Sequence, residues 1–362
     1  MEAALLHAED KVQGSPVTAP VDKVRVRLIS YNVFLRPPPV GSCTDHKDAR
    51  CKELVETVFG GFDVVCLQEM FGSFSRRRTN VIRDVQKHGL LYSAACPVPW
   101  PLCSGKLIDG GLLTLSKYKI VEHEFTPFQR GMDSDALAKK GVLYTKINLP
   151  NNKHMHIFST HVQASYVYTA DPGSVRIKQE QIGVLVALMK SKLATSSAVG
   201  PVVVTGDFNI NSLMNEKFAE GSPRFGGSGI APEEYSYLTE SLEQAVHELD
   251  NYENDVLDIF LEHNANQPIA TTCPFEWKLN DETELRCSLF VDPQEDLAGT
   301  DTSFWAPQRL DYCFLVNPKS QGGGKDTPVA VVKSCKVEPF STSERPYRQL
   351  SDHHALLVEF EV

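Results

Sequence analysis

The chain has 362 residues, with a hydrophobic fraction of 42% and a charged fraction of 23%, which is ordinary for a globular protein. Its 36 basic and 46 acidic residues give a formal charge of −10, so we expect nucleic acid not to be a partner. No apolar run approaches the roughly 20 residues of a membrane-spanning helix, and the N-terminal segment lacks the features of a signal peptide. We therefore expect a cytoplasmic or peripheral membrane protein. The sequence gives no indication of its oligomeric state.

Short runs with strand-like composition or alternation recur along the chain, at residues 24–33, 62–68, 111–116, 141–149, 154–162, 201–206, 309–316, 328–337 and 354–362. Helical patterns cover residues 47–59, 73–89 and 174–193. The last pattern has an apolar stripe of Ile182, Leu185, Val186 and Met189, with Ser174 as a candidate N-cap. Strands and helices interleave without the rhythm of a parallel barrel. The pattern predicts an α+β fold of two packed sheets with helices outside.

We expect residues 1–22 to be a disordered leader and residues 23–362 to form one domain. Gly, Pro, Asn and acidic residues dominate about 215–300, which predicts a loop and helix insertion. Among the nine cysteines, Cys66 and Cys313 lie in apolar runs and are expected to be buried free thiols. Three loop pairs are candidates for disulfides if the compartment is oxidising, namely Cys43/Cys51, Cys96/Cys103 and Cys273/Cys287. No Cys-x-x-Cys pattern indicates zinc.

Polar residues stand where several of the predicted strands end or begin. Asn32 ends the first strand and Glu69 follows the second, while His161, Asp207 and Asn209 end two later strands, and Asp352 and His353 precede the last. Taken singly, each residue has an ordinary explanation as a turn, cap or solvated side chain. Their recurrence at one kind of position predicts that they gather at one end of the sheets.

The set also makes chemical sense. Glu69, Asp207 and the side-chain oxygens of Asn32 and Asn209 are hard ligands suited to Mg²⁺, with Mn²⁺ as an alternative. His353 beside Asp352 is typical of a general base held in its useful tautomer. His161 and Asn209 are hydrogen-bond donors for a charged oxygen. A metal, a base and such donors suit attack of water on phosphorus. Neither a G-x-S-x-G elbow nor a phosphate-binding P-loop is present.

Six motifs resemble, in order, those of the endonuclease/exonuclease/phosphatase superfamily: SYN (30–32), LQE (67–69), STH (159–161), GDFN (206–209), LDY (310–312) and SDH (351–353). The resemblance spans residues 24–362. It implies a four-layer αββα sandwich of two mixed sheets flanked by helices, and a divalent-metal phosphoesterase that cleaves a phosphate ester.

Other segments resemble the neutral and bacterial sphingomyelinase branch: LQEMF with Phe71, DGGLLTLSKYKI (109–120), KGVLYTKI (140–147), THVQA (160–164) and Arg176-x-x-Gln179. The inositol phosphatases differ in carrying Trp-Cys-Asp-Arg before their final strands. Abasic-site endonucleases share the RLDY segment, so it does not discriminate. The hydrophobic anchor and membrane helices of animal sphingomyelinases are not found in this sequence.

The segment DSDALAKKG (133–141) has two interpretations. As a helix it would pair Asp135 with Lys139, a surface ion pair of little consequence. Asp135 and Lys140 are five residues apart and diverge by about 140° on a helix. Mammalian sphingomyelinases carry an Asp five residues before a Lys-Gly over the active site, which implies that Asp135 meets Lys140. We therefore predict that residues 133–141 are not a regular helix throughout.

The resemblance implies a Mg²⁺-dependent phospholipase C-type enzyme acting on sphingomyelin or a related phosphosphingolipid. We expect Glu69 to hold the metal with Asn32 nearby, His353 to activate water, and Asp352 to orient His353. Asp207 and Asn209 would position that water or a second metal, and His161 would stabilise the phosphoryl oxygens. Lys140 would stabilise charge on the phosphate or organise its loop, and Asp311 would support the site from behind.

Trp100, with Val98, Pro99 and Leu102, offers an apolar wedge for a membrane surface near the substrate. The same residues would equally suit a packed loop. Three alternatives to the sphingomyelinase remain open: a nuclease using the same residues, a lysophospholipase C, and a non-catalytic scaffold.

Overall fold

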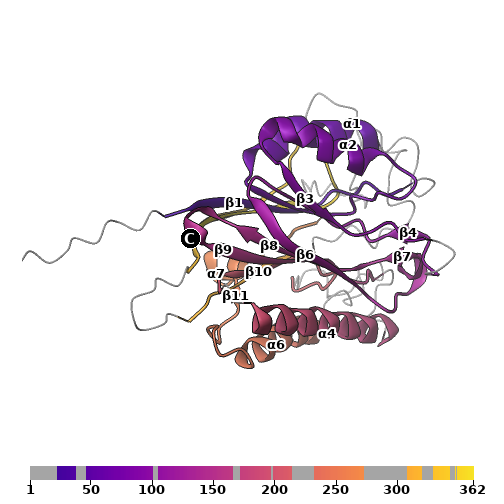
Figure 1. Ribbon diagram of the computed structural model, residues 1–362. Coiled ribbons are helices and arrows are strands. Elements are labelled where there is room, and N and C mark those ends of the chain that lie inside the picture. The colour runs from indigo at the N-terminus through magenta and orange to yellow at the C-terminus, as the bar shows by residue number, and fades with distance from the viewer. Residues whose placement is uncertain are drawn as a thin grey trace, which may run out of the picture.

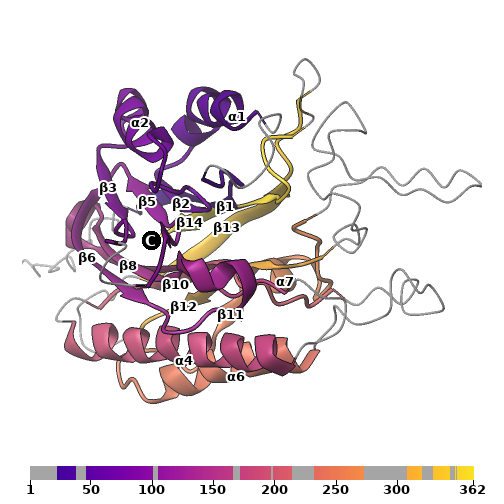
Figure 2. The ribbon, with the colours of Figure 1, turned by 90° about the vertical axis from the view of Figure 1, so that its right-hand side faces the viewer.

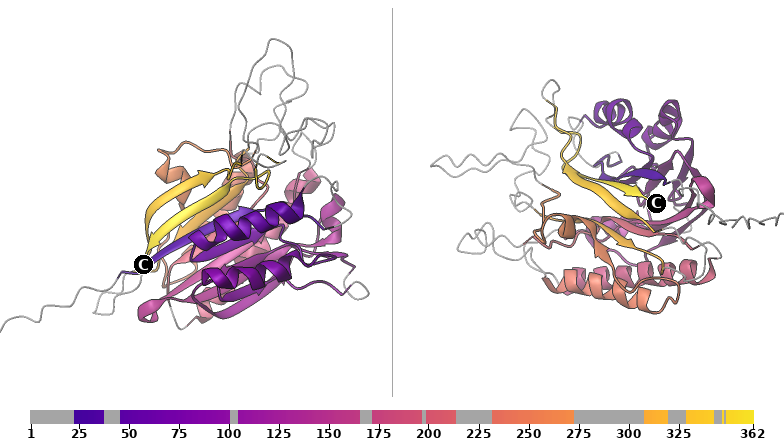
Figure 3. Two further views of the ribbon diagram at one scale, coloured as in Figure 1. Left: turned by 90° about the horizontal axis from the view of Figure 1, so that it is seen from above. Right: turned by 90° about the vertical axis from the view of Figure 1, so that its left-hand side faces the viewer.

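The computed structural model describes residues 23–37, 46–100, 105–165, 172–196, 199–213, 232–272, 308–319, 329–342, 347 and 349–362. Within these ranges, two six-stranded mixed sheets lie face to face, and helices cover the outer face of each (Figure 1). Two views along the strands show the same order of layers (Figure 2; Figure 3, right). The predicted αββα sandwich is confirmed.

The first sheet has the order β13-β14-β1-β2-β5-β3. Its strands are β1 (Arg25–Asn32), β2 (Val64–Gln68), β3 (Tyr92–Ala95), β5 (Leu113–Ser116), β13 (Val331–Glu338) and β14 (Ala355–Glu361). The second sheet has the order β11-β12-β10-β9-β8-β6. Its strands are β6 (Lys119–Pro127), β8 (Gly141–Asn148), β9 (His154–His161), β10 (Val202–Asp207), β11 (Leu257–Asp258) and β12 (Asp311–Val316). A two-stranded sheet pairs β4 (Ile108–Asp109) with β7 (Ala138–Lys139).

Side-chain alternation builds the layers. On β1, Ile29 and Tyr31 pack in one apolar cluster with Leu54 of the helical layer. Val26 and Leu28, on the opposite face of β1, pack in another cluster, between the sheets. Successive residues of a strand point to opposite faces, so a strand covered on both faces needs apolar residues at consecutive positions. A third cluster lies between the second sheet and its helices, which completes the apolar contacts of a four-layer sandwich.

The first helical layer contains α1 (Lys47–Glu53), which continues as a π-helix (Leu54–Val58) and a 3₁₀ turn (Phe59–Gly61), and α2 (Arg77–Asp84), which continues as a 3₁₀ turn (Val85–His88). Both lie across the first sheet when it is seen from above (Figure 3, left). The second layer contains α4 (Pro172–Thr195) and α6 (Pro232–His247), and α7 (Ile259–His263) follows β11. The remaining 3₁₀ turns are Asp133–Leu137 and Pro150–Asn152. None of the helices in the described ranges is long and apolar enough to cross a membrane.

All three predicted helices are present, with two differences. The helix expected from residue 73 begins at Arg77, because the backbone N–H groups of Gly72 and Ser73 are bound by the Asp109 carboxylate. Ser174 lies inside α4 and faces Ser165, with their Oγ atoms 3.3 Å apart, so the predicted N-cap is wrong. The predicted stripe of α4 does face the core, with Val186 only partly buried.

All nine predicted strands are present, but β3, β6 and β11 of the two large sheets were not predicted, and neither were the two-residue strands β4 and β7. β3, β6 and β11 are edge strands of their sheets. Edge strands carry charged or short polar segments that discourage pairing with other chains. In β6 the exposed residues include Glu122, His123 and Glu124, so the apolar alternation of a half-buried strand is missing.

Residues 133–141 form a 3₁₀ turn, the short strand β7 and the start of β8, so the prediction that they are not a continuous helix is confirmed. The predicted leader (1–22) lies outside the described residues, as do residues 215–231 and 273–300 of the predicted insertion. The remainder of that insertion contributes α6, β11 and α7 to the second sheet and its helical layer.

Cys66 and Cys313 are buried free thiols, as predicted. Cys51 and Cys96 are also free thiols in this structure, so the candidate pairs Cys43/Cys51 and Cys96/Cys103 are not bridged here. The third candidate pair, Cys273/Cys287, lies outside the described residues.

The topology brings six strand ends together. The parallel pair β1–β2 lies inside the first sheet, and the parallel pair β9–β10 lies inside the second. β14 and β12 run antiparallel to β1 and β10, so both begin where those strands end. All the predicted polar strand-end residues therefore lie at one end of the sandwich, opposite the C-terminus (Figures 1 and 2).

Candidate active site

Three buried residues form one row across the second sheet. Asp207, at the end of β10, pairs in register with His161 of β9 on one side and with Asp311 of β12 on the other. Gly206 precedes Asp207 with φ of 140°, and a Cβ there would lie 2.0 Å from the carbonyl oxygen of Thr160. Glycine is therefore needed for β10 to approach β9 closely just before the site.

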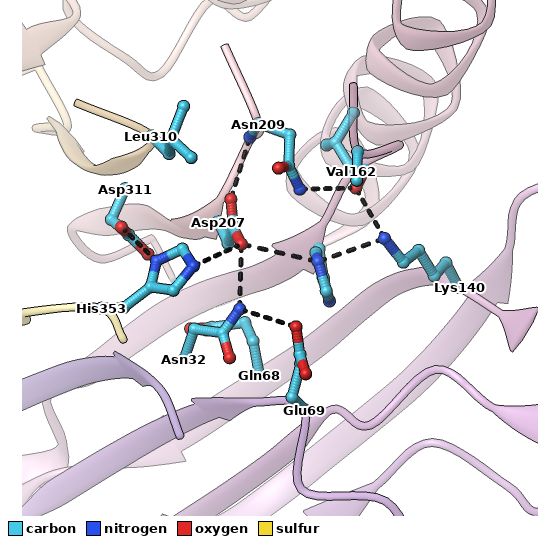
Figure 4. A network of polar contacts seen from close by, with 12 residues as sticks. Asn32, Gln68, Glu69, Lys140, Val162, Asp207, Asn209, Leu310, Asp311 and His353 are labelled. Carbon is cyan, nitrogen blue, oxygen red and sulfur yellow. Dashed lines mark hydrogen bonds and ion pairs between the residues drawn. The ribbon is translucent and has the colours of Figure 1, made fainter. Parts of the chain in front are cut away.

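The first sheet supplies Asn32 and Glu69. Asn32 ends β1 opposite Gln68, and the backbone turns sharply after β2, with Glu69 at φ 57°. The Asn32 amide nitrogen donates to Glu69 Oε1 at 3.2 Å and to Asp207 Oδ2 at 2.9 Å. Asn32 thus joins a carboxylate of each sheet, as Figure 4 shows. The structure confirms the predicted proximity of these three residues.

His353 is oriented by a different carboxylate from the one predicted. Its Nδ1–H donates to Asp311 Oδ2 at 2.8 Å, which leaves Nε2 facing Asp207 Oδ2 at 3.7 Å (Figure 4). Asp352 instead lies beside Ser351 Oγ at 3.3 Å. His353 forms an isolated β-bridge with Thr272, and neighbouring residues in extended backbone point to opposite sides. Adjacency in sequence therefore keeps Asp352 away from the imidazole ring.

Lys140 is buried and its ammonium group has three acceptors, one for each N–H. These are Asp135 Oδ2 at 2.6 Å, Val162 O at 3.0 Å and His161 Nε2 at 3.1 Å. Asp135 is held in turn by the backbone N–H of Ala164 at 2.8 Å. The five-residue pair implied by the resemblance is therefore formed.

The Lys140 contact determines the tautomer of His161. Lysine has only donors, so His161 Nε2 must accept and the ring proton must lie on Nδ1. His161 Nδ1 is buried and has no hydrogen-bond partner among the described residues. Burial, followed by the charges of Lys140 and His353, holds the pKa of His161 well below its usual value. His161 is therefore a neutral ring with one N–H available to a ligand.

The pKa values of three neighbouring groups, Asp207, Glu69 and His353, are instead raised. Burial raises the pKa of Asp207 to about 7, against the opposing effect of the His353 charge. Burial and the charge of Asp352 raise the pKa of Glu69. Burial disfavours protonated His353, but Asp311 and Asp207 outweigh it and raise its pKa well above the usual value. Perturbed groups packed together in this way are typical of functional sites.

Asn209, at φ 51°, completes the turn after β10. Its backbone N–H donates to Asp207 Oδ1 at 2.9 Å, and its amide nitrogen donates to Val162 O at 3.1 Å (Figure 4). The side chain therefore supports the same carbonyl that binds Lys140. As a predicted metal ligand or donor to substrate, Asn209 lies at the site with its amide nitrogen already engaged.

The residues present fit a hard divalent cation. Glu69 Oε2 is buried without a hydrogen-bond partner in the described part of the chain, and Asn32 joins the Glu69 carboxylate to that of Asp207. An unpartnered buried carboxylate oxygen is unfavourable unless a cation compensates it. Asp207, Asp311 and His353 also offer atoms within 4.8 Å of one another. The candidate ligands are therefore this cluster and the neighbouring Glu69, which Asn32 joins to Asp207.

Trp100 is not part of the central cluster. It follows β3, which runs parallel to β2 through the shared neighbour β5, so its loop leaves the sheet at the same end as Glu69. Trp100 is 71% exposed and Val98 is 52% exposed, whereas Pro99 is buried. Leu102 lies outside the described residues.

Two supporting residues were not predicted. Thr271 Oγ1 donates to Asp311 Oδ2 at 2.7 Å and accepts the backbone N–H of Asp311, so it fixes the carboxylate that orients His353. Arg50 is fully buried and binds the carbonyls of Val33 and Leu350, next to the segments that carry Asn32 and His353. The sequence gives no local signal for either, since both act on residues far along the chain.

The comparisons with known proteins identify the family of this chain. The model of the endonuclease/exonuclease/phosphatase family matches residues 29–353, and the chain belongs to that family. A sphingomyelinase of Dictyostelium discoideum is 26% identical over 346 residues, covering 83% of this chain and 72% of that protein. A sphingomyelinase C of Listeria ivanovii is 31% identical over 160 residues, covering 42% of this chain and 47% of that protein.

Solved structures show the same fold. A mutant beta toxin of Staphylococcus aureus with bound magnesium ions has a TM-score of 0.57 and 19% identity, covering 92% of this chain and 99% of that one. Sphingomyelinase C from Streptomyces griseocarneus has a TM-score of 0.55 and 19% identity, covering 93% of this chain and 99% of that one.

Proposed function

We propose that the chain is a Mg²⁺-dependent phosphodiesterase of the phospholipase C type, which hydrolyses sphingomyelin or a closely related phosphosphingolipid. The products are ceramide and the phosphorylated headgroup. The observation that carries the proposal is the placement of His353 and His161 on either side of Asp207, with Nε2 atoms 3.7 and 3.5 Å from Asp207 Oδ2. His161 Nε2 accepts from Lys140, so its donor is the buried Nδ1–H, which has no partner among the described residues. A base and a neutral donor that flank one carboxylate suit attack of water on a phosphodiester.

In this mechanism His353 takes a proton from water at Nε2 while Asp311 stabilises the resulting imidazolium through Nδ1–H. The water oxygen bonds to phosphorus, and the bond from phosphorus to the ceramide oxygen breaks. That oxygen takes a proton from solvent, and His353 later releases its proton to solvent. His161 donates its Nδ1–H to a phosphoryl oxygen. Lys140 maintains the His161 tautomer and adds positive charge beside the phosphate, with Asp135 holding the ammonium in place.

Glu69 and Asp207 would hold the cation, which would neutralise charge on the phosphoryl oxygens. Mn²⁺ would suit the same oxygen ligands. Asn32 directs its amide nitrogen at both carboxylates, and its Oδ1 accepts the backbone N–H of Phe34 at 3.1 Å. For Asn32 to be a ligand through Oδ1, its amide would have to rotate. Asn209 and Asp352 then serve to shape the surrounding backbone and charge.

Exposed apolar side chains near this end of the sandwich support a lipid substrate and peripheral contact with a membrane. Phe74 and Trp100 are 70% and 71% exposed, and Val98, Leu107 and Leu137 are 52%, 49% and 48% exposed. These five belong to the loops after β2 and β3 and around β4 and β7. Aromatic and aliphatic side chains of this kind insert at the boundary between headgroups and acyl chains. Trp100 is the proposed substrate-side anchor.

The test is release of phosphocholine from sphingomyelin in mixed micelles, with and without Mg²⁺, for the wild type and His353→Ala. We expect Mg²⁺-dependent release by the wild type alone. Equal release by both proteins, or by neither, would contradict the proposal. Parallel reactions with lysophosphatidylcholine, ceramide phosphoinositol and supercoiled plasmid DNA identify the alternatives. Preferential nicking of the plasmid would make the chain a nuclease, and inactivity on every substrate would favour a scaffold.

A further inference from the structure

The segment 106–111 connects the two halves of the active site. On one side it runs along the loop that carries Asp135 and Lys140. β4 pairs with β7 there, the Leu107 N–H donates to Leu137 O at 2.8 Å, and Lys106 Nζ donates to Ala136 O at 2.8 Å. This loop belongs to the second sheet, since it leads directly into β8.

On its other side the segment holds the turn that follows Glu69. Asp109 is fully buried, and its Oδ2 accepts from Gly72 N at 2.9 Å and from both N and Oγ of Ser73 at 2.7 Å. Its Oδ1 accepts from Arg78 Nη1 and from Gly111 N, both at 2.9 Å. A buried carboxylate with this many donors and a charged partner is fixed in one position. Asp109 therefore fixes the turn of the first sheet onto the segment.

Two glycines bring the segment close enough to both loops. A Cβ on Gly110 would lie 2.5 Å from Lys139 O and 2.9 Å from Lys140 Cα. Gly111 has φ of 69°, and a Cβ there would lie 2.8 Å from Glu69 Cα. The backbone of residues 110–111 thus separates Glu69 from Lys140, and neither glycine has room for a side chain.

We propose that Asp109 is a positioning residue that couples the metal carboxylate Glu69 to the Lys140–Asp135 loop. When Asp109 holds the turn, Glu69 is presented to the cation and Lys140 is held against His161. When that support is lost, both relax together, because Glu69 packs against Gly111 and Lys140 packs against the adjacent Gly110. The proposal rests on the metal role of Glu69 in the proposed function, and it requires no particular substrate.

The experiment measures two properties of the purified chain without substrate: Mg²⁺ affinity by titration calorimetry, and backbone hydrogen exchange of residues 133–141. For Asp109→Asn we expect Mg²⁺ affinity to fall about tenfold or more, as is typical when a residue supporting a metal ligand is changed. Exchange in 133–141 should accelerate. Gly110→Ala disturbs the segment from the Lys140 side, and we expect it also to weaken Mg²⁺ binding although Gly110 does not bind the metal.

Matched controls separate this effect from general destabilisation. Asp63 is a buried carboxylate with Arg27 and Lys117 as partners at the opposite end of β2, and Gly61 has open space around its Cβ position. Asp63→Asn and Gly61→Ala should leave both measurements unchanged. If Asp109→Asn fails to fold, Ser73→Ala provides the milder removal of the Oγ contact.

The coupling is overturned if Asp109→Asn or Ser73→Ala lowers Mg²⁺ affinity without accelerating hydrogen exchange in residues 133–141. It is also overturned if Gly110→Ala leaves Mg²⁺ affinity unchanged. A wild type that binds no Mg²⁺ refutes the proposed metal role, and the exchange measurement then decides the coupling alone. A wild type that binds Mg²⁺ with the expected variant pattern, yet hydrolyses no sphingolipid, refutes only the proposed substrate.

Discussion

His353 and Asp311 meet through a 2.8 Å hydrogen bond from Nδ1–H to Oδ2, and the same oxygen accepts the hydroxyl of Thr271 at 2.7 Å. One carboxylate oxygen is thus held from two directions, which fixes the imidazole with Nε2 toward Asp207. A base held in one tautomer by a buried carboxylate loses most of its efficiency when that charge is removed. Four predictions follow from this and the neighbouring contacts.

For Asp311→Asn we expect the turnover number to fall about 10²- to 10⁴-fold, the range typical of general-base catalysis. Asp352→Asn should lose far less, because its carboxylate contacts Ser351 and not the imidazole. The pH profile gives a second measure. Asp311 raises the pKa of His353, and the base acts when neutral, so removing the carboxylate should move the acidic limb of kcat/KM to lower pH. A larger loss for Asp352→Asn would contradict the assignment.

Lys140→Ala should reduce the turnover number about 10²-fold or more, the loss typical when a charge-stabilising donor is removed. The matched variant is Lys139→Ala, whose side chain lies next in sequence but is only half-buried and makes none of the Lys140 contacts with Asp135 and His161. Steady-state kinetics on sphingomyelin micelles compares the two. Equal losses would mean that the segment acts only as a surface ion pair.

His161 should be a neutral ring protonated on Nδ1 across the neutral and mildly acidic range, because burial and Lys140 both disfavour its charged form. Nitrogen NMR of labelled histidine reports the tautomer directly. Lys140→Met removes the positive charge and the donor to Nε2, so the pKa of His161 should rise and the Nδ1–H preference should weaken. Observation of an Nε2–H tautomer in the wild type would rule out the Lys140 contact as described.

Glu69→Gln should abolish the stabilisation of the folded chain by Mg²⁺. Without metal, burial raises the pKa of Glu69 above its unfolded value, so ionisation at neutral pH favours unfolding. The variant should then be as stable as the wild type or more stable. With Mg²⁺ at a hundred times its dissociation constant, the wild type should gain about 2.7 kcal/mol. Thermal melts with and without Mg²⁺ make the comparison, and an unchanged Mg²⁺ response in Glu69→Gln would exclude Glu69 as the ligand.

Strands covered on both faces were readable from the sequence because they need apolar residues at consecutive positions. The end of each such strand was equally clear, since Asn32, Glu69, His161 and Asp207 interrupt the apolar runs. The edge strands β3, β6 and β11 were not predicted, because their short or charged segments carry no such pattern, whereas the edge strand β13 was predicted. Polar positions at strand ends therefore predicted which residues gather at one end of the sandwich more reliably than the sequence predicted the complete sheets.

Which of these residues contact one another was harder to predict than which residues gather at this end of the sandwich. Asp352 was paired with His353 because the two are adjacent, but extended backbone separates adjacent side chains, and the partner is Asp311 from another strand. Thr271 and Arg50 act through contacts with residues distant in sequence, so nothing local marks them, and Asp109 was included only in a segment of family resemblance with no role assigned. The Lys140–Asp135 pair was predicted only through a family resemblance, since its spacing has no helical explanation.

The hydrogen bond from Asn32 to Asp207 runs from the end of one sheet to the end of the other. Because each sheet supplies only part of the reacting groups, catalysis requires the two layers to keep their native separation to within a fraction of an ångström. Gentle heating or dilute denaturant should therefore abolish turnover while each sheet is still intact. The turnover rate should therefore report how closely the two sheets are packed.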